Sequence, residues 1–118
     1  MKYMLLIYME DDALDEAGRE HCYVESTELA VELKASGNYL AASPLQPTST
    51  ATSVRVRDGK RMVTDGPFAE TREHLGGYFM VEAKDLDQAI AIAGRVPGAR
   101  VGTVEIRPVV EIPGLPAD

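Results

Sequence analysis

Asp65 and His74 are the residues whose chemical types most directly suggest a reaction. A histidine titrates near neutral pH and a carboxylate can accept a proton, so the pair favours acid–base chemistry on a small compound. Glu70 lies four residues before His74, and their side chains would align if the segment formed a helical turn. A structural interpretation is the alternative: Asp65 would accept backbone N–H bonds within the turn that Gly66 and Pro67 form.

Aromatic side chains are the candidate ligand contacts. Tyr3 and Tyr78 fall in segments expected to be strands, where their hydroxyl groups could line a pocket; packing in the core is the alternative. Phe68 is one of only two phenylalanines, and we expect it to anchor its loop in the core or across a dimer. We therefore take Tyr3, Phe68 and Tyr78 as the candidate ligand-binding residues.

Other kinds of site find little support in the sequence. Cys22 is the one cysteine, which excludes an internal disulfide, and on a helix the adjacent His21 would point about 100° away from it. A metal site needs at least three converging ligands, so no metal is expected from two separated histidines. Gly76 and Gly77 match no phosphate or dinucleotide loop, so no cofactor is expected, and the pair predicts close backbone packing or a bulge.

The length and net charge of the chain limit the kinds of partner that it can bind. The chain has 118 residues, enough for one domain, and a formal net charge of −7. Nucleic acid and anionic membranes are poor partners for so acidic a chain, because phosphate binding needs a basic face. No apolar run approaches the roughly 20 residues of a membrane span. The apolar start, residues 1–9, is followed at once by acids and reads as a strand, so a cytoplasmic protein is expected.

The predicted elements alternate in a regular order: strand, helix, strand, hairpin, strand, helix, strand. They cover residues 2–9, 15–36, 39–42, 53–64, 76–83, 85–96 and 103–112. The first strand is apolar almost throughout, which is typical of a central strand buried on both faces. Asp15 and Asp85 are expected N-caps. Asp58-Gly59 predicts the hairpin turn.

This order predicts an α+β fold, a ferredoxin-like sandwich with an inserted β-hairpin. Such a sheet carries helices on one face only, so its other face needs a cover. A second copy of the chain is the simplest cover, which predicts a homodimer. The domain is expected to span residues 1–112, and residues 113–118 form a tail.

Several segments resemble the DGPF-domain branch of the YCII-related family, and together they span roughly residues 1–112. The matching segments are Met1–Tyr8, Val54–Lys60, Asp65–Thr71, Leu75–Phe79 and Val104–Pro108. The resemblance implies a dimeric α+β barrel, in which two ferredoxin-like sheets pack face to face. It also implies a small cavity between the sheet and the helices of each subunit.

Some YCII-related proteins resemble small cofactor-independent enzymes that use a His–Asp pair for proton transfer. Their histidine lies on the first helix about eleven residues before its terminal glycine, and this chain has Ser26 there. Their aspartate precedes a Pro-aromatic pair near the chain end, where this chain reads Arg95-Val96-Pro97-Gly98. That pair does not carry over to this sequence.

Three functions follow as expectations. The first is a small homodimeric domain with a small-molecule pocket. The second is a cofactor-independent enzyme doing acid–base chemistry, with Asp65 as base and His74 or His21 and a tyrosine hydroxyl assisting. The third, implied by the resemblance, is a regulatory partner of an extracytoplasmic-function sigma factor, acting through the acidic first helix or the Arg-bearing hairpin.

Overall fold

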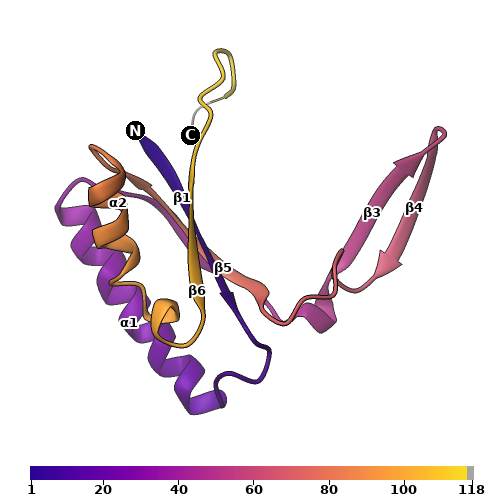
Figure 1. The fold of residues 1–118 in the computed structure, drawn as a ribbon, viewed down its shortest axis with the longest axis horizontal. Coiled ribbons are helices and arrows are strands. Elements are labelled where there is room, and N and C mark those ends of the chain that lie inside the picture. Colours follow the sequence, from indigo (N-terminus) through magenta and orange to yellow (C-terminus); the bar gives the residue numbers. More distant parts are fainter. Residues whose placement is uncertain (117–118) are drawn as a thin grey trace.

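A four-stranded antiparallel sheet carries two α-helices on one of its faces (Figure 1). The structure is a computed structural model that describes residues 1–116. The elements are β1 (Lys2–Met9), α1 (Glu16–Ala35), β2 (Tyr39–Pro44), a 3-10 turn (Thr48–Thr50), β3 (Thr52–Arg57), β4 (Lys60–Asp65), β5 (His74–Glu82), α2 (Leu86–Ala93), a second 3-10 turn (Pro97–Arg100) and β6 (Thr103–Pro108). The predicted order of elements is therefore confirmed.

The strands follow the order β2-β5-β1-β6, and each neighbouring pair is antiparallel. The apolar β1 is central, as predicted, because it pairs with β5 on one side and β6 on the other. The two edge strands, β2 and β6, each end at a proline, Pro44 and Pro108. Without the hairpin, the elements follow the β-α-β-β-α-β order.

Both helices begin at the predicted N-caps. The Asp15 carboxylate accepts a hydrogen bond from the Gly18 backbone N–H at 2.7 Å. At α2, the Asp85 carboxylate accepts from the Gln88 N–H at 2.9 Å, while the Gln88 side-chain carbonyl accepts from the Lys84 N–H at 2.8 Å. These bonds satisfy donors that the first turn of a helix leaves without partners.

The core lies between the sheet and the helices. Because side chains alternate along a strand, Tyr3 and Leu5 of β1 point to the helical side together with Phe79 and Val81 of β5. The remaining core members come from the two helices and their flanks: Leu29, Leu33, Ala83, Ala89, Ile92, Ala93 and Val96. The placement of Leu29 and Leu33 on the buried side of α1 confirms the helical periodicity of the sequence.

The other face of the sheet, here called the open face, is covered by no helix or strand among residues 1–116 (Figure 1). Met4 of β1 pairs with Met80 of β5, and Leu6 pairs with Tyr78, so four apolar side chains occupy its centre. All four are half-buried, whereas their neighbours Tyr3 and Leu5 are buried. The prediction that β1 is buried on both faces is therefore wrong for the isolated chain, because both helices lie on one side.

The hairpin β3–β4 forms a separate two-stranded sheet that projects on the side away from the helices (Figure 1). Asp58 and Gly59 both have positive φ, 52° and 73°, which is the turn that Asp-Gly favours. The projection makes the chain extended: its radius of gyration is 15.9 Å. A compact chain of this length has roughly 13–14 Å.

The adjacent glycines of β5 have different roles. The β1–β5 register passes from Ile7↔Gly77 to Tyr8↔Leu75, so Gly76 occupies a β-bulge. A Cβ on Gly77 would lie 3.0 Å from the Ser43 carbonyl oxygen and 3.2 Å from the Pro44 Cα. Both predicted roles, a bulge and a close backbone approach, are confirmed, one at each glycine.

Substitution of the two glycines by alanine should separate these roles. Gly77→Ala pushes β2 away from β5, and we expect it to lower the free energy of unfolding by about 1–3 kcal/mol. Gly76→Ala is the matched control, because its Cβ would meet nothing nearer than 3.9 Å. Urea unfolding at one fixed protein concentration measures both. Equal losses for the two variants would contradict a close approach at Gly77.

Candidate functional site

A cleft runs between α1 and the ends of β1, β2 and β5; we call it the α1 cleft. It has an outer part of about 410 Å³ and an inner part of about 400 Å³. Residues from all four elements line both parts, which makes the two parts continuous: Met9, Cys22, Tyr23, Pro44 and Gly76. Each part alone has the volume of a typical small-ligand pocket.

The outer part is the more polar of the two and contains His74. The His74 Nε2 lies 3.8 Å from Asp11 Oδ2, and the Thr48 hydroxyl donates a hydrogen bond to that same oxygen at 3.2 Å. The His74 side chain is only 18% exposed. The imidazole and the carboxylate therefore lie near each other at the mouth of the cleft, and both are side chains of the kinds that act in general acid–base chemistry.

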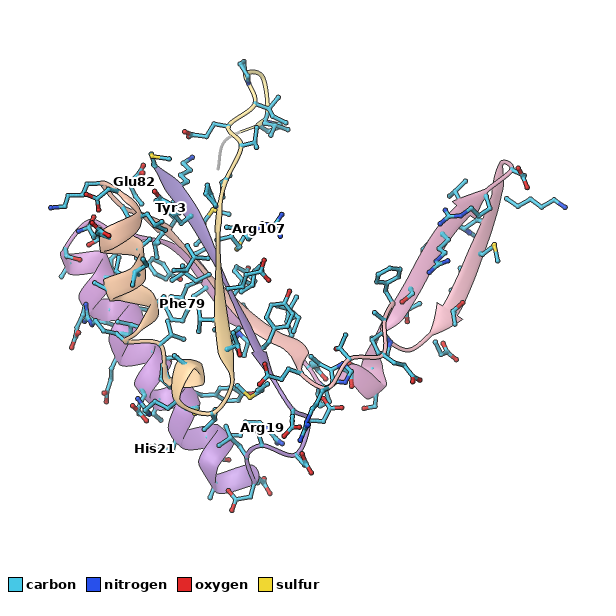
Figure 2. The ribbon with its side chains drawn as sticks, viewed as in Figure 1. Tyr3, Arg19, His21, Phe79, Glu82 and Arg107 are labelled. Atoms are coloured by element: carbon cyan, nitrogen blue, oxygen red, sulfur yellow. The ribbon has the colours of Figure 1, made fainter. Side chains whose placement is uncertain are left out.

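Arg19 is the cation of the outer part, and it comes from the first turns of α1 (Figure 2). Among residues 1–116, no carboxylate lies within 4.0 Å of the Arg19 guanidinium. The neighbouring Glu10 is instead bound to Arg72, at 2.5 Å. Arg19 can therefore offer its N–H donors to a bound anion.

The inner part has apolar walls with a few hydroxyl groups. Ile7, Ala30, Tyr39 and Phe79 supply apolar surface, and the hydroxyl groups come from residues on α1 and β2: Ser26, Thr27 and Ser43. Ser26 stands where the resemblance implied a histidine in enzymatic relatives, so this position faces the cleft without a titratable group. The inner part is suited to the apolar body of a ligand.

Cys22 lies where the two parts meet, and it is half-buried. Burial raises the pKa of the Cys22 thiol above its ordinary value of 9.0, the Glu25 carboxylate raises this pKa further, and Arg100 lowers it. The thiol is therefore neutral at physiological pH and a weak nucleophile. In this environment Cys22 acts as a small hydrophobic side chain.

The other predicted catalytic residue, Asp65, does not line the cleft. It ends β4 on the hairpin and is exposed, whereas His74 begins β5 at the cleft mouth. One chain therefore does not bring Asp65 and His74 together. Two bonds hold the turn after Asp65: the Gly66 N–H donates to the Ala51 carbonyl at 2.7 Å, and the Ser53 hydroxyl donates to the Gly66 carbonyl at 2.8 Å.

The predicted ligand-binding aromatics separate into three environments. Tyr3 is in the core, where its hydroxyl donates to the Met1 sulfur at 3.7 Å. Tyr78 belongs to the lining of the inner part, while the alternation along β5 places its side chain on the open face, opposite to that of the buried Phe79. Phe68 is 76% exposed, and its ring centroid lies 5.2 Å from the Arg55 guanidinium carbon. Phe68 therefore does not enter the core of its own chain but packs at the base of the projecting hairpin, and its anchoring across a dimer stays a prediction.

The predicted alignment of Glu70 with His74 is also wrong. His74 is the first residue of β5, and the residues before it form bends with no helical turn. Sequence reasoning missed the actual partner, Asp11, which the pairing of Met9 with His74 brings close. The one signal in the sequence was the run of acids that directly follows β1.

His21 points away from the cleft. It lies two residues after Arg19 on α1, hence on a different side of the helix, and its Nε2 is 3.0 Å from Glu25 Oε1 (Figure 2). Across residues 1–116, no group of three or more His, Cys, Asp or Glu side chains converges as a metal site would require. In that same part of the chain, no helix has the length and apolar character needed to cross a bilayer.

These features define a small α+β domain with an open sheet face and one continuous cleft. A family model, the YCII-related domain, matches residues 1–113. The chain is also 32% identical over 113 residues to the uncharacterized protein R00369 of Rhizobium meliloti (strain 1021), over 92% of this chain and 91% of that protein. The chain belongs to the YCII-related domain family.

Alkylation of Cys22 tests the environment at the centre of the cleft. Because the thiol pKa is raised in the folded chain, we expect the iodoacetamide reaction to reach its half-maximal rate at a higher pH than in urea-unfolded protein. Mass spectrometry of samples quenched between about pH 7 and pH 11 measures this midpoint. A folded-state midpoint at or below the unfolded one would contradict the assignment.

Proposed function

We propose that this YCII-related domain is a homodimeric small-molecule-binding protein whose ligand occupies the α1 cleft. The observation that carries the proposal is the difference between the two parts of this cleft. The inner part is lined by apolar side chains with a few hydroxyl groups, and the outer part includes charged side chains. Pockets of this composition hold the body of a ligand by apolar contact and fix its orientation by a few polar groups.

The charges of the outer part favour a ligand with a carboxylate or similar anionic group. Of the acids at the mouth, Glu10 is paired with Arg72, and Asp11 with Thr48 and His74. The Arg19 guanidinium can therefore form charge-assisted hydrogen bonds with an anionic ligand. The ligand class that we propose is a small organic acid with an apolar, for instance aromatic, body.

The homodimer is proposed from the open face. Its central side chains, Met4, Leu6, Tyr78 and Met80, form an apolar surface that a second open face would cover. Together with the Asp65–Thr71 motif of the DGPF branch, this supports a ferredoxin-like subunit in a dimeric α+β barrel. The assignment to that branch is likewise part of the proposal.

An enzyme is the second candidate, favoured by the proximity of His74 to Asp11 in the cleft. In that role neutral His74 would accept a proton from a carbon or oxygen of the bound compound, and Asp11 would stabilise the imidazolium that forms. Asp65, which does not line the cleft, stays a sequence prediction for this chemistry.

A matched pair of arginine variants tests the binding proposal. Arg19→Gln should weaken binding of aromatic carboxylates by about tenfold or more, since hydrogen bonds to charged groups contribute about 1.5–3 kcal/mol. Arg95→Gln is the control, because Arg95 pairs with Glu32 outside the cleft lining. Saturation-transfer NMR with aryl carboxylates and their neutral amides measures binding. If no carboxylate binds the unmodified protein, or Arg19→Gln binds it equally well, the proposal fails.

Proton transfer in D₂O tests the enzyme candidate. An acid–base enzyme should catalyse exchange of deuterium into a C–H bond next to the carbonyl or carboxylate of a bound compound, detected by loss of its ¹H NMR signal. His74→Gln should abolish this exchange while the compound still binds. His21→Gln is the control, because His21 lies outside the cleft. Equal exchange in both variants would exclude His74 as the base.

A further inference from the structure

The hairpin β3–β4, residues 52–65 and here called the arm, pairs with no other strand among residues 1–116. Four of its apolar side chains, Val54, Val56, Met62 and Val63, are between 53% and 61% exposed. An isolated two-stranded hairpin is at best marginally stable in water, and exposed apolar groups of this kind mark interaction surfaces. The arm therefore needs a surface to pack on.

The two faces of the arm differ. Val54 pairs directly with Val63, and Val56 lies two residues along β3 on that same face. Arg55, Arg57 and Lys60 occupy the opposite face. Because paired residues share a face of the sheet, the face that carries the three valines also carries Arg61, and the opposite face also carries Met62. We call the first the valine face and the second the basic face. The valine face is the one suited to contact.

The base of the arm fixes its direction. The Gly66 N–H bond to Ala51 and the Ser53 hydroxyl bond to the Gly66 carbonyl close the base, and Phe68 packs under the Arg55 guanidinium. Gly66 has a φ of +103°, which a residue with a side chain rarely adopts. The arm thus projects to the side of the sheet that bears the open face (Figure 1).

Charge selects the partner surface. The arm contains four basic and two acidic residues and has a net charge of +2. Because the whole chain has a net charge of −7, the other 104 residues have a net charge of −9. Two arms would repel each other, whereas an arm and the body of a second copy attract. A second copy on the open face would also lie on the side toward which the arm projects (Figure 1).

From these observations we infer that each arm packs its valine face on the body of the second copy, so that the two protomers clasp each other. The body here means residues 1–51 and 66–116 without α1, which lies on the side of the sheet away from the open face (Figure 1). This inference rests on the proposed homodimer and adds a second, reciprocal contact to it, since two-fold symmetry repeats the arm contact twice. The DGPF motif is then the hinge that aims the arm.

Sedimentation equilibrium of three proteins tests this. The unmodified chain should be a dimer. The double variant V54D/V63D places two carboxylates on the valine face. It should raise the dimer dissociation constant by about tenfold or more, which corresponds to about 1.4 kcal/mol or more, because burial of an unpaired charge is unfavourable. The control V24D/V31D adds the same charge at two similarly exposed valines of α1 and should leave the constant unchanged.

A second variant guards against unfolding of the arm itself, because two carboxylates directly opposite each other destabilise a hairpin. V54T/V63T keeps β-branched residues and should weaken the dimer less than V54D/V63D but more than the control. Hydrogen exchange supplies the direct readout: amides of residues 52–65 should be protected in the dimer and lose protection on dilution to monomer.

Each result is decisive. If the unmodified chain is a monomer, both the proposed homodimer and the arm inference are overturned. If it is a dimer, but V54D/V63D dimerises as tightly as V24D/V31D and the arm amides exchange equally at all concentrations, only the arm inference is overturned. Ligand binding in the α1 cleft is measured separately, through the Arg19→Gln comparison, and is unaffected by either result.

Discussion

The antiparallel pairing of β1 with β5 is the contact on which the fold and the cleft both depend. It aligns Leu5 with Phe79 under the helices, and thus builds the core. At its other end it aligns Met9 with His74, which brings the acidic loop after β1 to the mouth of the cleft. The bulge at Gly76 lies within this same pairing, so core, cleft and titratable groups all follow from one register.

Most charged side chains near the cleft mouth are engaged in separate contacts with one another or with a hydroxyl group. Glu10 binds Arg72, Glu73 accepts a hydrogen bond from Thr103, and Asp11 lies near His74. These contacts are mostly exposed, so each contributes little to stability. These contacts occupy the carboxylates of Glu10 and Asp11. Among residues 1–116, the Arg19 guanidinium therefore has no carboxylate within 4.0 Å.

The order of elements could be predicted from the sequence because it depends on local signals: the apolar run of β1, the caps at Asp15 and Asp85, and the Asp58-Gly59 turn. The site could be predicted only in part. His74 was found from its chemical type, whereas its neighbour Asp11 depends on a register between distant strands. Exposure of Phe68 could not be predicted either, because an aromatic residue in a turn motif usually indicates burial.

The prolines at the ends of β2 and β6 have a consequence for association. These are the two edge strands of the main sheet, and each ends at a residue that lacks a backbone N–H. Such edges resist the addition of further strands from other molecules, which is how sheets grow into fibrils. The margins of this sheet therefore disfavour open-ended polymerisation.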